Sequence, residues 1–276
     1  MLLSVQDLQV TYRTPGQKPV AAVRGVSFDI NAGESFGIVG ESGCGKSSLA
    51  RAIIGLHPVS SGTLRYEDTP LNPQDKAKSL LFRGAVQMVF QDAVGSLNPR
   101  MTVQQTLAEV LGVHEQLSAP QIVLRISELL DRVGLPETIL DAYPREMSGG
   151  QCQRVSLARC LACNPRLIIA DEPVSALDVS VQARILNLLR RLQRELNLAV
   201  LLISHDLAVV RNICDRVAVM QNGVFVEKGL AEQVLNTPQH PYTRELLAAV
   251  PDIGRALRRL PSVTQPPALR NPTHHD

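Results

Sequence analysis

Short apolar runs recur along the chain, and their lengths and borders are those of β-strands. The first forty residues contain three of them, LSVQDLQVTY, VSFDI and ESFGIVG, which are separated by turns that contain Pro or Gly. Later runs of the same kind are AVQMVFQD (85–92), RLIIA (166–170) and AVLLIS (199–204). Because these runs are nearly continuous, the pattern predicts the buried strands of a layered core.

Between these runs the apolar residues recur at three- and four-residue spacing, which is the period of a helix. A helix is expected over 46–54, helical periodicity extends over 102–133, and another helix follows Ser148 to about residue 163. One later face consists of apolar residues at this spacing: Val181, Ile185, Leu188, Leu189, Leu192 and Leu196. Strands that alternate with helices predict an α/β core, interrupted by a helical insert at about 92–158.

The last part of the chain predicts smaller elements. VAVMQNGVFVEKG is typical of a hairpin that turns at Asn222-Gly223, because this dipeptide adopts the backbone angles of tight hairpin turns. After Gly229 a short helix is expected, followed by a Pro-rich, mobile tail from Pro261. We therefore expect one domain over 1–235 and a C-terminal extension over 236–276.

Composition narrows the class of protein. Of the 276 residues, 45% are hydrophobic and only 3% aromatic, so the core must consist mainly of Leu, Val, Ile and Ala. A net charge of +2 does not mark a nucleic-acid-binding protein. No run approaches the roughly 18 apolar residues of a membrane span, and the N-terminus, with Asp7 in a strand-like pattern, does not resemble a signal peptide. We expect a soluble cytosolic chain that needs a partner for any membrane role.

The five cysteines are Cys44, Cys152, Cys160, Cys163 and Cys214. Their odd number and the lack of an export signal argue against a disulfide framework. Cys160 and Cys163 have CxxC spacing, but they lie within a helical pattern and no second pair accompanies them. Two interpretations stay open: buried thiols on a helix face, which the pattern favours, and a metal or redox site.

The stretch GESGCGKS (40–47) matches the phosphate-binding pattern G-x-x-x-x-G-K-[ST], after a predicted strand and at the start of a predicted helix. Its glycines allow backbone amides to close around phosphate oxygens. Lys46 can reach the β- and γ-phosphates, and Ser47 can ligate Mg²⁺. The context disfavours a chance glycine-rich turn, so the segment predicts a nucleotide site.

Two further strand ends carry polar residues. LIIADEP ends in Asp171, which could support Mg²⁺, and in Glu172, which could activate water as a general base. The alternative is a solvated acidic pair before the turn at Pro173. LLISHD places His205 after another strand, and parallel sheets bind ligands at the carboxyl ends of their strands. An ordinary cap or surface residue is the alternative for His205.

The stretch MSGGQCQR (147–154) places Ser148 and two glycines at a helix start, where free backbone amides bind anions. Together with GESGCGKS, LIIADEP, SALD (175–178) and SHD (204–206), in this order and spacing, it resembles the ATP-binding subunits of ABC transporters. The resemblance covers about residues 2–230. It implies a P-loop NTPase core with an antiparallel β subdomain and a helical subdomain.

The resemblance also implies roles for individual residues. In that family each ATP lies between the phosphate loop of one subunit and the signature motif of the other, in a head-to-tail dimer. The implied ATP- and Mg²⁺-binding loop is Gly40, Glu41, Ser42, Gly43, Cys44, Gly45, Lys46, Ser47 and Ser48. Asp171 would support Mg²⁺, Glu172 would be the catalytic base, and His205 would contact the γ-phosphate. Gln91 would sense Mg²⁺ and water and link to the membrane subunit.

Other implied roles concern the far side of the nucleotide. The ATP of the opposite subunit would be bound by the signature residues Ser148, Gly149, Gly150 and Gln151, and Asp178 would close the dimer interface. Met147 stands where the family usually has Leu, a change between flexible apolar side chains with little expected effect. Tyr12 matches the aromatic residue that stacks on adenine; a strand-end tyrosine packed on the core is the alternative.

Two segments narrow the subfamily. FQDAVGSLNPRMTV (90–103) and HPYTRELLAAVP (240–251) resemble the importers of peptides and nickel whose two ATPases are separate chains. Ala93 departs from the pattern, since Pro is common there. No cysteine follows Cys214, so no iron–sulfur site is predicted. The resemblance implies hydrolysis of ATP that energises import of a di- or oligopeptide, nickel or a metal chelate.

The partners implied by the resemblance are a second ATP-binding subunit, two membrane permease subunits and, indirectly, an extracytoplasmic solute-binding protein. The implied place is the cytoplasmic face of the inner membrane. Alternatives are an exporter ATPase, which the HPYT segment disfavours, and an ABC ATPase that acts on DNA or ribosomes. The latter usually carry coiled coils, zinc modules or tandem ATPase domains, none of which the sequence shows. The cargo and the identity of the second ATPase stay open.

Overall fold

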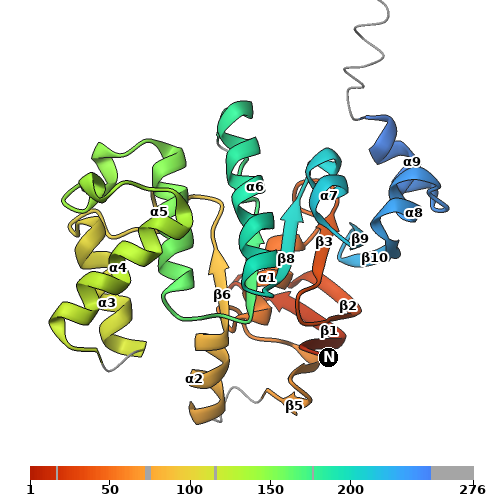
Figure 1. Ribbon diagram of the computed structural model, residues 1–276. Helices are drawn as coiled ribbons and strands as arrows, with labels where there is room; N and C mark the ends of the chain where they lie inside the picture. The colour runs from red at the N-terminus through yellow and green to blue at the C-terminus, as the bar shows by residue number, and fades with distance from the viewer. Residues whose placement is uncertain (17, 72–75, 115–116, 176, 250–276) are drawn as a thin grey trace, which may run out of the picture.

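The chain is built around two β-sheets (Figure 1). The computed structural model describes residues 1–16, 18–71, 76–114, 117–175 and 177–249, and the predicted tail from Pro261 lies outside them. The smaller sheet is antiparallel, in the order β2-β1-β4-β5, with β1 (Leu3–Tyr12), β2 (Val20–Ile30), β4 (Ser61–Tyr66) and β5 (Thr69–Pro70). The larger sheet, in the order β10-β9-β3-β8-β7-β6, consists of β3 (Ser35–Val39), β6 (Val86–Val89), β7 (Leu167–Asp171), β8 (Ala199–Ser204), β9 (Arg216–Gln221) and β10 (Val224–Leu230).

Five neighbouring strands of the larger sheet are parallel, from β9 through β3, β8 and β7 to β6, and β10 is an antiparallel edge. The predicted hairpin is β9 and β10. Its turn residues Asn222 and Gly223 have φ angles of 48° and 83°, which are left-handed conformations that these two residue types accept readily. The strand and hairpin predictions are therefore confirmed, and so is the α/β core.

The larger sheet separates two apolar cores, because side chains alternate between its faces along each strand. In β7, Leu167 and Ile169 belong to one core, whereas Ile168 and Ala170 belong to the other. The first core also contains the buried side of α1 (Lys46–Ile53) and the inward-facing residues of β1 and β2. The helix α1 therefore lies between the two sheets, with its first residue next to the carboxyl end of β3.

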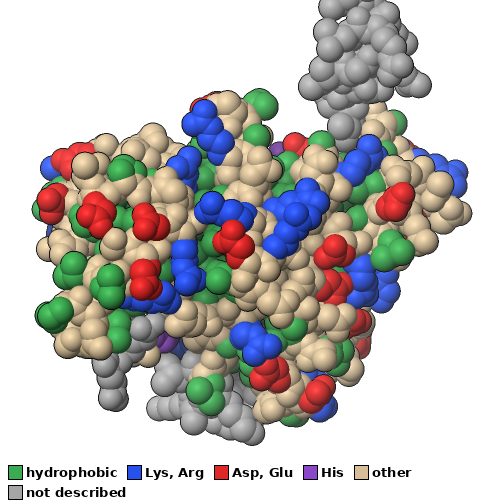
Figure 2. Space-filling model, in the orientation of Figure 1, with side chains coloured by type: hydrophobic (Ala, Val, Ile, Leu, Met, Phe, Trp, Pro, Cys, Tyr) green, Lys and Arg blue, Asp and Glu red, His purple; other side chains and the backbone are tan. Residues whose placement is uncertain are grey.

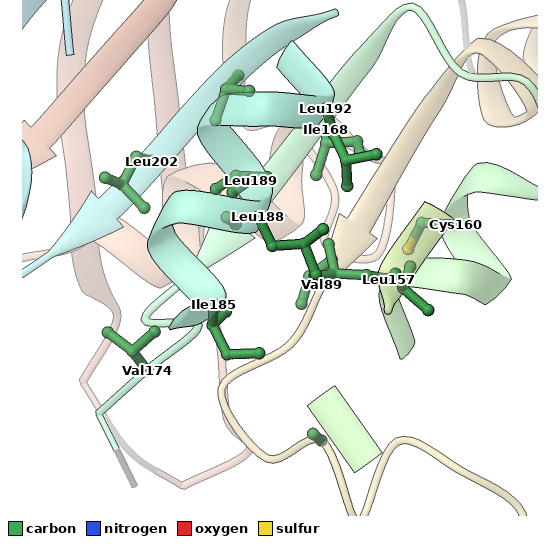
Figure 3. Packing of buried hydrophobic residues seen from close by; sticks show 14 of the residues in the cluster. Val89, Leu157, Cys160, Ile168, Val174, Ile185, Leu188, Leu189, Leu192 and Leu202 are labelled. Carbon is green, nitrogen blue, oxygen red and sulfur yellow. The ribbon is translucent and has the colours of Figure 1, made fainter. Parts of the chain in front are cut away.

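The second core is covered by helices. These are α6 (Val179–Glu195), α7 (Leu207–Ile213), α8 (Ala231–Asn236) and α9 (Pro241–Ala248), together with the helical lobe described below. Figure 3 shows the apolar face of α6 against the sheet, with Ile185, Leu188, Leu189 and Leu192 near Val89, Ile168 and Leu202. Leu196 departs from the predicted face, because the helix ends at Glu195 and leaves this side chain 36% exposed.

A helical lobe lies beside β6 (Figure 1). It consists of α3 (Val103–His114), α4 (Ala119–Val133), two 3₁₀ turns at Glu137–Ile139 and Pro144–Glu146, and α5 (Gly149–Leu161). The continuous periodicity over 102–133 is divided into two helices, because Ser118 starts a new one: its backbone amide donates to Gln121 Oε1 at 2.8 Å. The helix after Ser148 ends two residues before the predicted end.

Several elements have no counterpart in the sequence prediction: β4, β5, α2 (Lys76–Ala85) and α7. The single short helix expected after Gly229 is two helices, α8 and α9. The sequence of β4, SGTLRY, has no apolar run that would predict a strand. None of its residues is fully buried in the structure. Such strands are set by their neighbours in the sheet rather than by a local pattern. Across the described segments, no helix is both long enough and apolar enough to cross a membrane.

The two cysteines of the CxxC pair have different surroundings. Cys160 is buried on α5, and burial raises the pKa of its thiol to about 12. Cys163 lies beyond the last residue of α5 and is partly exposed. The prediction of a buried helix-face thiol is therefore right for Cys160 and wrong for Cys163. Within the described ranges, no three or more His, Cys, Asp or Glu side chains group as metal ligands.

Candidate functional site

The loop of residues 40–45 joins the carboxyl end of β3 to α1, and its surroundings require its glycines. Gly40 has a φ of 155° and Gly45 a φ of 112°. A Cβ atom at Gly40 would collide with the carbonyl oxygen of Met220 in β9, and one at Gly45 would collide with that of Ala22 in β2. The loop is therefore wedged between the two sheets in a conformation that suits glycine alone.

Lys46 begins α1 and folds back over the loop. The residue is 4% exposed, and its Nζ donates to the carbonyl oxygens of Gly40 and Glu41, both at 2.8 Å. The Sγ of Cys44 lies 3.8 Å from the same nitrogen. The ammonium group is thus held among the backbone groups of the loop, where the phosphate-loop pattern requires it.

Ser47 and Asp171 bring a hydroxyl and a carboxylate together at the end of β7. Ser47 Oγ donates to Asp171 Oδ1 at 2.9 Å, and Asp171 is 1% exposed. Burial raises the pKa of Asp171, while the hydrogen bond from Ser47 and the charges of Arg51 and Lys46 act in the opposite direction. These paired oxygen donors have the chemistry that Mg²⁺ prefers.

Glu172 follows in a left-handed backbone conformation, with a φ of 46°, which is uncommon for this residue type. Its Oε2 accepts a hydrogen bond from Gln91 Nε2 at 3.2 Å and lies 3.2 Å from Nδ1 of His205. Gln91 also donates to Ser175 Oγ at 3.3 Å. The carboxylate is therefore held from two sides, on a strained backbone of the kind that collects at functional sites.

A cavity of about 190 Å³ opens at this edge of the larger sheet. Its lining comes from the loop, α1, β2 and the ends of β6 and β7: Ala22, Ser42, Gly43, Gly45, Lys46, Ser47, Ser48, Gln91 and Glu172. The fold thus brings the phosphate loop, Gln91 and Glu172 into one space. Asp171 joins this site through Ser47, and His205 joins it through Glu172.

Tyr12, at the end of β1, lies beside the phosphate loop. Its hydroxyl donates to Ser48 Oγ at 3.0 Å, and its ring meets that of His57 edge-on, with centroids 5.1 Å apart. The ring is partly buried and packs on the first core. Tyr12 therefore packs on the core, as the alternative interpretation expected, and also lies next to the phosphate loop. Its contact with adenine stays a prediction.

The signature turn, residues 148–151, is bonded within itself. The Ser148 amide donates to Gln151 Oε1 at 2.8 Å, and Ser148 Oγ accepts from the Gln151 amide at 3.3 Å. Ser148 and Gly149 are exposed, and no residue of the turn lines the cavity at the phosphate loop. The predicted second anion site is thus separate from the first within one chain.

Asp178 shares a surface with the signature turn. It caps α6 by accepting the Val181 amide at 3.0 Å, and this hydrogen bond is the main cause that lowers the pKa of its exposed carboxylate. Leu177 and Val181, on either side of Asp178, pack so closely on Gly149 and Gly150 that added Cβ atoms would approach within 3.0 and 2.6 Å.

Two contacts of the site were not predicted from the sequence. Ser175 accepts the hydrogen bond from Gln91 noted above. Tyr242, in α9, accepts a hydrogen bond at 3.2 Å from the backbone amide of Glu41 in the phosphate loop. The HPYT segment marked a subfamily in the sequence, but it gave no indication that its tyrosine reaches a loop 201 residues away.

Comparisons of the sequence with known proteins agree with this geometry. The sequence model of the ABC transporter family matches residues 23–175, and that of the oligopeptide/dipeptide transporter C-terminal region matches residues 226–274. The oligopeptide transport ATP-binding protein OppF of Lactococcus lactis is 46% identical over 258 residues, covering 91% of this chain and 81% of the relative. OppF of Escherichia coli is 45% identical over 260 residues, covering 91% and 78%.

Solved structures show the same fold. The dimeric, post-hydrolysis structure of the ATP-binding cassette MJ0796 bound to ADP and Pi has a TM-score of 0.76 at 29% identity, and covers 83% of this chain and 99% of that one. The cbiO1 protein of Clostridium perfringens, part of the complex cbiONQ, has a TM-score of 0.76 at 28% identity and covers 93% and 98%. The predicted fold class is therefore confirmed. The chain belongs to the ABC transporter family, as an ATPase subunit of its oligopeptide/dipeptide transporter group.

Proposed function

We propose that the protein hydrolyses ATP to drive the import of oligopeptides through partner permeases. The observation that carries the proposal is the meeting of the phosphate loop, Gln91 and Glu172 at one cavity, in a chain 46% identical to an oligopeptide transport ATP-binding protein. Peptide is favoured over nickel or a metal chelate because the relatives reported above are oligopeptide transport proteins and the extension matches that group.

The phosphate loop binds the nucleotide phosphates. The amides of Gly43 through Ser48 surround them, and Lys46 exchanges its carbonyl partners for the β- and γ-phosphate oxygens. This exchange requires only a small movement of the Lys46 side chain, because its ammonium group already lies within the loop. Tyr12 stacks on adenine from the end of β1.

Ser47, Asp171 and Gln91 are the residues that would hold Mg²⁺. The 2.9 Å contact between Ser47 Oγ and the buried Asp171 carboxylate supports this assignment, because it places two oxygen donors side by side next to the loop. When bound, Mg²⁺ would neutralise negative charge on the phosphates during transfer.

Glu172 acts as the general base. Its carboxylate accepts a proton from the attacking water, and the strained backbone at the end of β7 fixes its direction. Gln91 and His205, both bound to Oε2, keep that carboxylate in one rotamer. His205 also contacts the γ-phosphate, which ties the phosphate group and the base to one side chain.

The signature turn binds the ATP of a second subunit. A helix start carries roughly half a positive charge and unpaired N–H groups, which suit a γ-phosphate. Because the turn is exposed and separate from its own phosphate loop, its nucleotide must come from outside the chain. Asp178, on the same surface, closes the interface. The partner is a second copy or a paralogous ATPase.

The membrane partners are two permease subunits, with an extracytoplasmic solute-binding protein acting through them. The protein then works at the cytoplasmic face of the inner membrane, and the segment after Gln91 transmits closure of the ATPase dimer to the permease. On the face drawn in Figure 2, acidic side chains lie on the helical lobe and basic ones nearer α6.

Purification of the full-length chain from membranes, followed by identification of its companions, tests the proposal. Two integral membrane proteins and a second ATPase are expected. The complex is then reconstituted in vesicles with its binding protein, and uptake of a labelled oligopeptide is compared with uptake of Ni²⁺. Recovery with ribosomes or DNA, export in place of import, or transport of Ni²⁺ alone would contradict the proposal.

A further inference from the structure

The C-terminal extension reaches the phosphate loop through one tyrosine. Helix α9 lies next to α8 at the side of β9 and β10 (Figure 1). Tyr242 is 6% exposed, and its ring belongs to the second core. Its hydroxyl oxygen is the acceptor for the Glu41 amide, at 3.2 Å. The extension is therefore part of the immediate surroundings of the nucleotide loop.

The turn before α9 is fastened to the sheet by Glu227 of β10. The Glu227 carboxylate accepts hydrogen bonds from the amides of Gln239 at 2.8 Å and His240 at 3.1 Å. Burial alone would raise the pKa of Glu227, but the hydrogen bonds from these amides lower it. His240 Nδ1 in turn accepts the Tyr242 amide at 3.2 Å. These hydrogen bonds fix the backbone that leads to Tyr242, and thereby the place from which its ring extends into the core.

On the other side of the contact, Glu41 is held from two directions. Its amide donates to Tyr242, while its carbonyl oxygen accepts from Lys46 Nζ at 2.8 Å and from the Cys44 amide at 3.3 Å. A single residue therefore separates the tyrosine hydroxyl from the lysine ammonium. Any shift of Glu41 moves the carbonyl group on which Lys46 rests.

We propose that Tyr242 is a positioning residue for the phosphate loop, through which the C-terminal extension sets the affinity for ATP. The inference rests on the proposed role of the loop and of Lys46 in binding phosphate. Tyr242 does not line the cavity at the loop, so it acts through Glu41. Its hydroxyl holds the second residue of the loop in place before nucleotide binds, which reduces the ordering cost of binding.

Tyr242→Phe in the full-length chain tests this, because phenylalanine keeps the ring in the core and removes only the acceptor. The dissociation constant of a fluorescent ATP analogue is expected to rise about 3- to 10-fold, the factor that corresponds to one lost neutral hydrogen bond. The KM for ATP should rise in parallel, while kcat at saturating ATP stays within about twofold, because the hydroxyl does not contact the reacting atoms.

Tyr66→Phe is the matched control. Tyr66 is a half-buried tyrosine of β4 whose ring packs against Phe82, and it is absent from the lining of the cavity. It loses the same atom, and ATP affinity should equal that of the wild type. A merely structural tyrosine at 242 would behave like this control: a change in melting temperature without a change in ATP affinity.

The alkylation rate of Cys44 gives a second readout that does not depend on activity. Cys44 is itself a residue of the loop, is 8% exposed, and donates its amide to the Glu41 carbonyl, so loosening of Glu41 should expose its thiol. Iodoacetamide should modify Cys44 several-fold faster in Tyr242→Phe than in the wild type, as measured by mass spectrometry without nucleotide.

Wild-type ATP affinity in Tyr242→Phe would overturn the proposal. Lys46→Ala separates this result from failure of the proposed function: if that variant binds ATP normally, the assignment of the loop is itself wrong. Should Tyr242→Phe not fold, Glu227→Gln replaces it, because it loosens the turn and keeps the tyrosine. Weaker ATP binding in Glu227→Gln supports the proposal, and unchanged binding overturns it.

Discussion

The phosphate loop and the signature turn are both glycine-containing helix starts, yet the chain supports them in opposite ways. The loop is wedged between β2 and β9, and Lys46 beside it is 4% exposed. The signature turn is exposed at Ser148 and Gly149, and its side-chain hydrogen bonds remain within the first turn of α5. One site is enclosed by its own chain, whereas the other presents its amides outward.

This difference bears on the proposal that one chain carries two anion sites for one kind of ligand. An enclosed loop can hold phosphate alone, because its amides and lysine already converge. An exposed helix start is a weak site until a second surface closes over it and excludes water.

The largest expected effect is at the phosphate-loop site, where one substitution should stop ATP turnover and another should weaken ATP binding. Glu172→Gln should retain ATP binding and lose about 10²- to 10⁴-fold in turnover, because the proposed general base is removed. With Mg-ATP it should accumulate as a dimer on size-exclusion chromatography. Lys46→Ala should remain monomeric because its ATP binding is weakened. A Glu172→Gln protein that stays monomeric, both alone and with its natural partner subunit, would contradict this prediction.

The constrained conformation of the phosphate loop should affect the free energy of unfolding when one of its glycines is replaced. Gly45→Ala forces a left-handed backbone angle on alanine and a collision with the carbonyl of Ala22, so the free energy of unfolding should fall by about 2 kcal/mol or more. Gly112→Ala is the matched control, because Gly112 lies exposed in α3 with open space around it. That change should raise the unfolding free energy by up to about 1 kcal/mol. Equal stabilities in urea denaturation would show that the loop is not constrained.

The signature turn can be compared with a second serine cap, which differs in its hydroxyl group: Ser148 Oγ accepts from the Gln151 amide at 3.3 Å, whereas Ser118 Oγ donates to Gln121 Oε1 at 2.7 Å. Ser148 and Ser118 each start a helix and each donate a backbone hydrogen bond to a glutamine oxygen at 2.8 Å. Substitution by alanine should cost about 1 kcal/mol of stability at either position. Only Ser148→Ala should reduce ATP-dependent dimerisation and ATPase activity, by about tenfold, because it loses a hydrogen bond to a charged phosphate. If Ser148→Ala and Ser118→Ala lost the same activity, Ser148 would act only as a helix cap and would not bind nucleotide.

The smallest effect concerns Cys44. Burial raises the pKa of this thiol above its ordinary value, so little thiolate forms near neutral pH and alkylation should be slow. The rate should still be rising at pH values above the ordinary thiol pKa, and Mg-ATP should suppress it. Cys163, which is partly exposed, should react first. Complete modification of Cys44 with undiminished ATPase activity would exclude it from the neighbourhood of the nucleotide.

Much of the fold could be predicted because its signals are local. The buried strands of the larger sheet are continuous apolar runs, and Asn222-Gly223 has one favourable turn geometry. Ser118 shows the limit of such signals, since helical periodicity runs through it, yet its cap with Gln121 and the proline in the first turn of α4 start a new helix there. The strand β4 was missed for a related reason: its place depends on pairing with β1.

By itself the sequence determined the chemistry: a lysine in a glycine loop, two acids after a strand, and a serine before two glycines at a helix start. Only the tertiary structure decided which of these groups meet. It placed Gln91 against Glu172, left the signature turn facing outward, and brought Tyr242 to the phosphate loop. The reason is physical: contacts between distant residues depend on how sheets and helices pack, and no local pattern of residues encodes that packing.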